Sequence, residues 1–172
     1  MNPRAEIWNI LHDGGISEIE GSIPGEVRIR VSIPYLRHMF PGDGKDILVR
    51  LTDCSKFSMR IWEGDIVTDN LKRIMDTDTE ILSTESEDVP VHVFTTLGEL
   101  DVDFEDFSLS LDNGNKITFG QICTACENYW NRWEAEAKQK KSLLSTGASP
   151  TNSTTISPAE SPFNTIPIDN PS

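Results

Sequence analysis

The chain has 172 residues, with 28 Asp and Glu against 15 Lys and Arg, which gives a formal charge of −13. The scattered basic residues argue against nucleic-acid binding, because a phosphate backbone is met by clustered Lys and Arg. The start lacks a basic segment followed by an apolar one, and no apolar run approaches eighteen residues, so neither a secretory signal nor a membrane span is expected. Three cysteines, an odd number, fit a reduced cytoplasmic compartment.

The first predicted element is a short helix from Asn2 to Leu11. Asn2 is suited to cap it and Pro3 to occupy its first turn. A turn follows at His12-Asp13-Gly14-Gly15, where we expect Asp13 to bond the backbone and one of the two glycines to have a positive φ.

Strand patterns dominate the middle of the chain. Apolar residues alternate with polar ones in five segments, which lie at Val27–Ile33, Phe57–Ile61, Val89–Val93, Leu100–Phe104 and Phe107–Leu111. The denser run Ile47-Leu48-Val49, with Leu51, predicts a strand covered on both faces. A helix is predicted from Thr68 or Asp69 to Met75. The segment 112–115 predicts a bulged hairpin loop in which Leu111 faces Ile117.

The clearest helix begins near Phe119. Thr118 and Gln121 stand in the capping-box relation, and an apolar, aromatic stripe follows at intervals of three and four residues. We expect the tryptophans of this stripe, Trp130 and Trp133, to cover the sheet. From Ser142 onward, twenty of thirty-one residues are Ser, Thr, Pro or Asn, which predicts disorder.

These elements predict an α+β fold, with an antiparallel β-sheet packed against a long C-terminal amphipathic helix and one or two shorter helices. Residues 1–141 form the single predicted domain, and residues 142–172 the disordered tail.

A window from Ile74 to Asn115 holds twelve acidic residues and no Lys or Arg. Within it, four carboxylates alternate with apolar residues, so a straight strand would place them on one face; they are Glu99, Asp101, Asp103 and Glu105. Three interpretations stay open. The row is a solvated face that discourages edge pairing, a docking surface for a basic protein, or a hard-cation site with oxygen ligands.

Other chemical motifs are weaker. His12 and Asp13 are the residue types of a metal-dependent hydrolase pair, but the two following glycines favour a turn. Cys123 and Cys126 have redox or zinc half-site spacing but fall in the second turn of a helix, on or beside its apolar stripe, which favours packing. There is no phosphate loop, dinucleotide fingerprint or glycine-flanked serine, so no cofactor is predicted.

Several short segments carry a resemblance. They are Trp8-x-x-Leu11-His12-Asp13-Gly14-x-Ile16, Pro34-Tyr35-Leu36-Arg37, Glu80-Ile81-Leu82-Ser83, Leu111-Asp112-x-Gly114 and Tyr129-Trp130-x-x-Trp133. Together they resemble a family of small, mostly uncharacterised bacterial cytoplasmic proteins. The opening motif is also similar to that of some immunity proteins of bacterial toxin systems. That resemblance implies a compact acidic α+β protein whose acidic face blocks a cationic toxin, without catalytic residues.

The sequence therefore leads to one hypothesis and one alternative. The hypothesis is a non-enzymatic, cytoplasmic interaction domain that binds a basic protein through Glu99, Asp101, Asp103 and Glu105. The alternative is a small-ligand or divalent-metal-binding domain that uses His12, Asp13 and nearby carboxylates.

Overall fold

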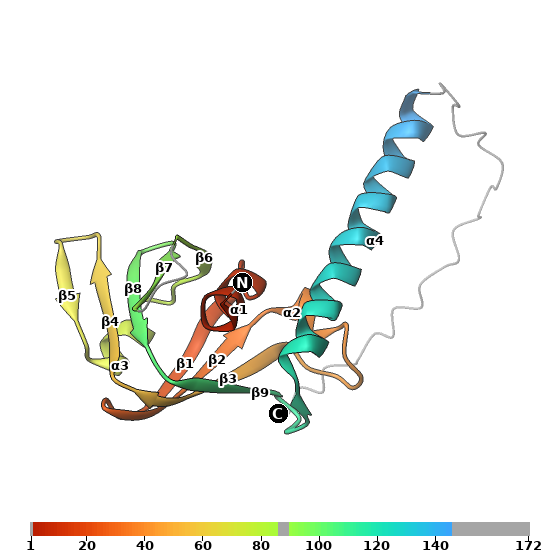
Figure 1. Cartoon of the computed structure of the whole chain (residues 1–172). Coiled ribbons are helices and arrows are strands. Elements are labelled where there is room, and N and C mark those ends of the chain that lie inside the picture. The colour runs from red at the N-terminus through yellow and green to blue at the C-terminus, as the bar shows by residue number, and fades with distance from the viewer. Residues whose placement is uncertain (1, 86–89, 146–172) are drawn as a thin grey trace, which may run out of the picture. The chain divides into compact units, whose positions relative to one another are not determined.

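The computed structural model describes residues 2–85 and 90–145 (Figure 1). The chain divides into two compact units, Met1–Glu136 and Ala137–Ser172. The first unit holds all the described strands, three short helices and the start of the long helix α4 (Phe119–Ser145). Of the second unit the structure describes the last turns of α4, whose side chains at 137–144 are exposed. The helix thus continues four residues beyond the predicted start of the tail, and the rest of that tail lies outside the described residues.

The described strands form two antiparallel five-stranded sheets, so the predicted α+β class is confirmed, with two sheets where one was expected. In the first sheet the strand order is β1 (Gly15–Gly21), β2 (Gly25–Ser32), β3 (Asp46–Cys54), β9 (Asp106–Leu111) and β10 (Lys116–Ile117). In the second sheet it is β5 (Ile66–Thr68), β4 (Lys56–Ile61), β8 (Gly98–Asp103), β7 (Val91–Thr95) and β6 (Ile81–Thr84).

A corner joins the two sheets. β3 runs into β4 and β8 runs into β9, and these two continuous segments stay paired on both sides of the corner. Between the pairs Thr52↔Asp106 and Lys56↔Asp103, the segment from β3 to β4 has three residues and the segment from β8 to β9 has two. The extra residue makes a bulge, and Asp53 there has a φ of 49°. Because a bulge bends and twists its strand, the pair leaves the first sheet and enters the second.

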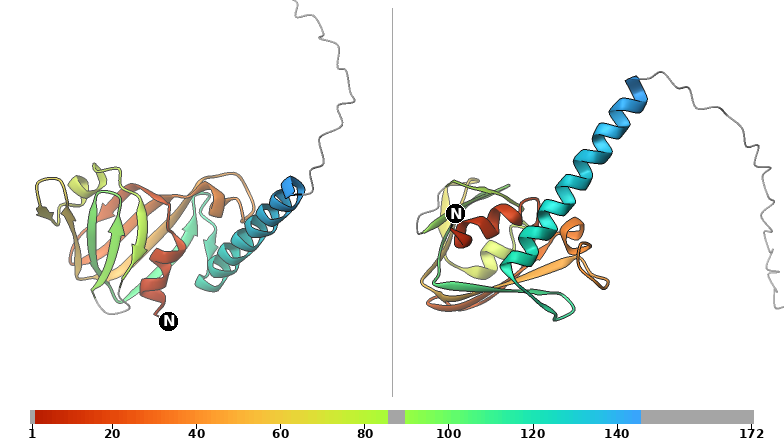
Figure 2. Two further views of the ribbon diagram at one scale, coloured as in Figure 1. Left: turned by 90° about the horizontal axis from the view of Figure 1, so that it is seen from above. Right: turned by 45° about the vertical axis from the view of Figure 1, so that its right-hand side comes forward.

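The inner faces of both sheets enclose one apolar core. The alternation predicted for β2, β4, β8 and β9 is confirmed, since the inward side chains of each strand are buried. The helix α1 (Pro3–Ile10) packs against β6 and β7, and Figure 2 shows it inside the angle between the sheets. Near its end the sheets meet again, through the bridge Gly15↔Glu80.

The start of the chain follows its predicted local chemistry with one exception. The Asn2 side chain accepts a hydrogen bond from the backbone N–H of Arg4, as expected of a cap. In the turn that follows, however, Asp13 itself has the positive φ, 63°, and neither glycine does. Gly14 is needed for another reason, because a Cβ there would overlap the Val31 side chain.

Two further predictions need correction. Leu48 is half-exposed on the outer side of β3, opposite Arg30, so this strand is covered on one face only. The hairpin pairs Ile117 with Leu109, and Leu111 closes the loop by donating its N–H to the carbonyl of Asn115. Alternation finds the apolar positions of a strand, but the register comes from the turn.

Both later helices begin where polar caps occur. The helix α3 (Leu71–Met75) is capped by Asn70 and lies within the predicted range. At α4, Thr118 and Gln121 make the two reciprocal bonds of a capping box. Ile122 and Ala125 are buried in the core, but Trp133 is 53 % exposed. The aromatic stripe therefore does not cover the sheet along its whole length.

A buried ion pair fixes the loop after the short helix α2 (Pro34–Arg37). The Arg37 side chain is fully buried, and its Nε donates to Oδ1 of Asp112 at 2.7 Å. Its remaining N–H groups point to backbone carbonyls of residues 40–43. The other carboxylate oxygen of Asp112 accepts the N–H groups of Lys45 and Asp46. Burial by itself would raise the pKa of Asp112, but these bonds lower it to about 2.

Asp53 provides a test of the corner. Replacement by Gly should raise the free energy of unfolding in urea, because a left-handed conformation costs a residue with a side chain roughly 1–2 kcal/mol. Asp53→Val should lower it, since a β-branched residue is worse still in this conformation. Asp69→Gly, an exposed control without a positive φ, should be neutral or destabilising. Equal effects of glycine at both positions would contradict strain at the corner.

The ion pair predicts a pH-dependent stability. At pH 7, Asp112→Asn should lower the free energy of unfolding by about 3 kcal/mol, because Arg37 is left buried without its carboxylate. The Asp112 pKa is lowered on folding, so its contribution is complete above pH 4 and is lost as the pH falls toward 2. Urea titrations should therefore show the mutant and wild type converging in acid. Asp43→Asn, at an exposed side chain, should change little at either pH.

Candidate functional site

The outward side of the second sheet is the candidate site, and we call it the outer face. It carries the side chains that alternate with the buried ones on four neighbouring strands. These are Val67 on β5, Lys56, Ser58 and Arg60 on β4, Glu99, Asp101 and Asp103 on β8, and His92 and Phe94 on β7. Trp62 and Leu97 continue the face at one end, where the Trp62 N–H donates to the Leu97 carbonyl at 3.1 Å.

The structure brings three of the four predicted carboxylates together. Glu99, Asp101 and Asp103 lie in a row along β8. Glu105 lies beyond the end of this strand, at the corner, where its backbone N–H bonds to Thr52. Its side chain is exposed but does not continue the row, because the expectation of one straight strand fails at the bend.

Basic side chains from a distant part of the sequence lie beside this acidic row. In the register of β4 and β8, Lys56 stands opposite Asp103 and Arg60 opposite Glu99. The Nζ of Lys56 lies 2.8 Å from Oδ2 of Asp101, and His92 bonds the other oxygen of that carboxylate. Partial burial would raise the pKa of Asp101, but the bonds from Lys56 and His92 lower it below its ordinary value.

Sequence reasoning missed this neutralisation. The alternation at Phe57, Met59 and Ile61 already implied that Lys56 and Arg60 point outward, but nothing local predicts that β4 pairs with β8. Although the window from Ile74 to Asn115 contains no Lys or Arg, two basic side chains of β4 therefore lie beside its carboxylates in the folded protein.

Large apolar side chains are also exposed on the outer face. Trp62 is 51 % exposed, Val67 63 % and Leu97 44 %. Val67 lies opposite Arg60, which in turn lies opposite Glu99, so the apolar and charged groups are neighbours. Exposed apolar side chains grouped with charges are typical of protein-binding surfaces.

A shallow hollow of about 240 Å³ lies in the same face, lined by Ser58, Arg60, Val67, His92, Glu99 and Asp101. A nucleophilic serine would need a base within hydrogen-bonding reach. Here Asp101 lies between Ser58 and His92 in the strand register, and the strands that carry these two residues are about 10 Å apart. The hydroxyl and the imidazole are therefore not arranged as a nucleophile and its base.

The other predicted site residues lie elsewhere. His12 Nδ1 is 2.9 Å from the carbonyl oxygen of Asn9, its ring stacks on Trp130 at 5.4 Å, and its Nε2 is 3.6 Å from the Asp13 carboxylate. In residues 2–85 and 90–145 no group of three His, Cys, Asp or Glu side chains is placed to hold a metal ion.

The three cysteines are free thiols. Burial raises the pKa of Cys54 to about 11 and also raises those of Cys123 and Cys126. Their nucleophilic thiolate forms are thereby disfavoured.

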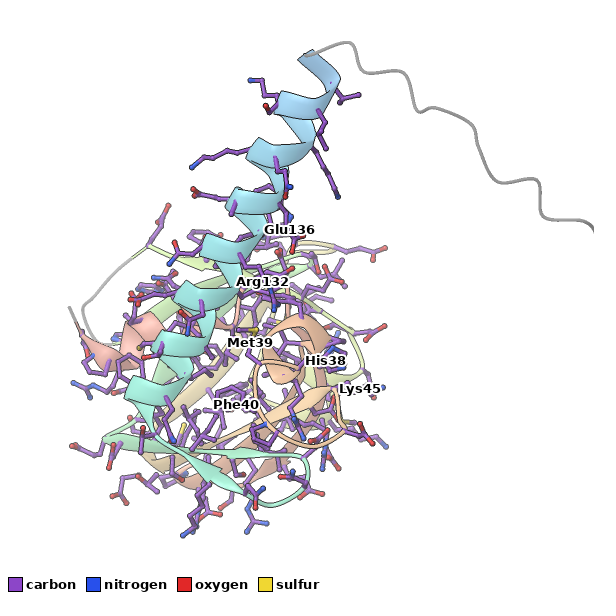
Figure 3. The ribbon with its side chains drawn as sticks, turned by 90° about the vertical axis from the view of Figure 1, so that its right-hand side faces the viewer. His38, Met39, Phe40, Lys45, Arg132 and Glu136 are labelled. Atoms are coloured by element: carbon purple, nitrogen blue, oxygen red, sulfur yellow. The ribbon has the colours of Figure 1, made fainter. Side chains whose placement is uncertain are left out.

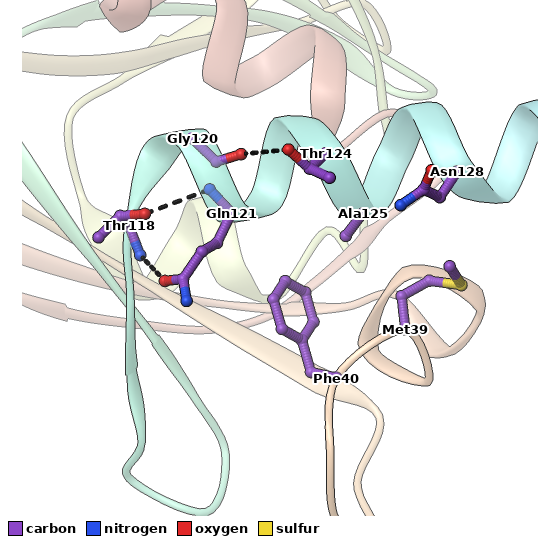
Figure 4. A pocket seen from close by; sticks show the side chains of 8 residues that line it. All are labelled: Met39, Phe40, Thr118, Gly120, Gln121, Thr124, Ala125 and Asn128. Carbon is purple, nitrogen blue, oxygen red and sulfur yellow. Dashed lines mark hydrogen bonds between the residues drawn. The ribbon is translucent and has the colours of Figure 1, made fainter.

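A second concavity, of about 420 Å³, lies between α4 and the loop after α2 (Figures 3 and 4). Met39 and Phe40 form one wall, and the first turns of α4 form the other. Most polar groups along this groove bond one another. Thr118 pairs with Gln121, and the Thr124 hydroxyl donates to the Gly120 carbonyl. It has no charged lining residue, so the outer face remains the stronger candidate.

Comparisons with protein-family models, with curated proteins and with solved structures gave no match. Among the described helices, none combines the length and the apolar character needed to cross a membrane. The geometry of the outer face is therefore the basis for assigning a function.

The lowered pKa of Asp101 can be tested directly. Lys56→Gln should raise this pKa toward its ordinary value, because it removes a cationic hydrogen-bond donor. A carboxyl-carbon NMR titration would measure the change. Lys45→Gln removes the same charge at an exposed position in the loop before β3 and should leave the Asp101 pKa unchanged. A titration of Asp101 that is identical in all three proteins would contradict the assigned pairing.

Proposed function

We propose that the chain is a non-enzymatic protein-interaction domain and that the outer face is its docking surface. The observation that carries the proposal is the combination of exposed Trp62, Val67 and Leu97 with the carboxylate row on one face. Protein interfaces gain most of their binding energy from a few buried apolar anchors, and surrounding charges guide the encounter.

We infer that the partner is a basic protein. The chain has a formal charge of −13, and further exposed carboxylates lie near the ends of the face, including Glu63 and Glu105. Asp101 is already bonded to Lys56 and His92. We therefore assign attraction of the partner mainly to Glu99 and Asp103 and to the surrounding acids. In this role the protein would act as an immunity-like inhibitor, in keeping with the resemblance of its opening motif.

The test is a pull-down with the tagged full chain at about 50 and 500 mM salt, with bound proteins identified by mass spectrometry. We expect a basic protein that is captured at low salt and released as salt rises, because exposed charges are screened. The variant Glu99→Gln/Asp103→Asn should weaken its binding about tenfold, which corresponds to roughly 1.4 kcal/mol. Trp62→Ala should weaken it at both salt concentrations, since burial of an apolar anchor is not screened.

The matched control is Glu20→Gln/Glu127→Gln, which removes the same charge from exposed positions outside the face. It should keep the wild-type affinity. If the two double variants bind the partner equally well, net charge rather than the outer face attracts it, and the proposal fails.

A further inference from the structure

The outer face carries charges of both signs in an ordered arrangement, whereas docking of a basic partner would need only negative charges. On β4 the outward residues Lys56 and Arg60 are cations, and on the adjacent β8 the outward residues opposite them are the anions Asp103 and Glu99. The cations on β4 and the anions on β8 thus form two parallel rows of opposite charge. Trp62 and Leu97, opposite each other, end these rows.

The pattern extends to β5 and β7, the strands that flank β4 and β8. Read across the sheet from β5 to β7, one line of the face is Val67, Arg60, Glu99 and Phe94. It runs from an apolar residue through a cation and an anion to an apolar residue. Reversing the line exchanges the two charges and leaves apolar residues at both ends.

From this pattern we infer that the outer face binds a second copy of the chain. A two-fold axis parallel to the strands, between β4 and β8, would lay β4 of each copy on β8 of the other. Arg60 would then meet Glu99 of the second copy, Trp62 would meet Leu97, and Val67 would meet Phe94. Every contact occurs twice, and no like charges oppose each other in this line.

The size of the face sets the strength of the pairing. Four strands at a spacing of about 4.8 Å and six to seven residues at about 3.3 Å cover roughly 20 Å by 20 Å. This is about half of the ~800 Å² that each partner buries in a standard interface. We therefore expect a reversible dimer that dissociates in the micromolar range, and an electrostatic contribution that weakens as salt rises.

The inference rests on the proposed use of the outer face for docking. A second copy and a basic partner would compete for it, so self-association would hold the face covered until a stronger partner displaces the second copy. The two proposals can fail separately, because the dimer is measured with the pure protein and no partner present.

The experiment is sedimentation equilibrium of the full chain from about 1 µM to 1 mM at low salt. Arg60→Glu and Glu99→Arg should each weaken self-association at least tenfold, because each brings like charges together across the two-fold axis. An equimolar mixture of the two variants should recover a dimer, since one face now carries Glu at both positions and the other carries Arg. This recovery also shows that both variants are folded.

Arg73→Glu, which makes the same charge change on the exposed surface of α3, is the matched control and should self-associate like the wild type. A wild-type chain that stays monomeric to 1 mM would overturn the inference. So would a dimer that neither Arg60→Glu nor Glu99→Arg weakens, or variants that weaken it singly but do not associate when mixed.

Discussion

The architecture depends on the one-residue excess at the corner between β3 and β4. If the two long segments paired without it, they would continue as one flat ribbon with two exposed apolar sides. The bulge at Asp53 turns the pair, so that the inward side chains of both sheets face the same core. The same bend ends the carboxylate row at Asp103 and separates Glu105 from it. One residue therefore defines both the core and the extent of the outer face.

Local patterns predicted the longer strands of both sheets and three of the helices, but not β1, β5, β6 or α2. Period-two alternation located β2, β4, β8 and β9, and capping chemistry located the starts of α1 and α4. These signals act over a few residues. The positive φ at Asp13 was missed because the glycine beside it is used for close packing against Val31, a contact with a residue seventeen positions away.

The sequence predicted the row of carboxylates in the candidate site, but not the side chains that lie beside this row on the neighbouring strands. The alternation of Glu99, Asp101 and Asp103 was visible in the sequence, and the structure places these three on one face. What the sequence did not reveal was the neighbouring strand, because the pairing of β4 with β8 depends on the corner and not on either strand alone. That pairing brings Lys56 and Arg60 to the carboxylates and changes an acidic face into one with ordered charges of both signs.

The buried ion pair between Arg37 and Asp112 has a consequence for the order in which the protein folds. These residues are 75 positions apart, so the chain must close a long loop before the pair can form. The contact becomes favourable only after β3 has paired with β9 and the hairpin is in place, which makes it a late event. The loop that it holds, including the Phe40 wall of the groove beside α4, would then be among the last parts of the domain to become ordered.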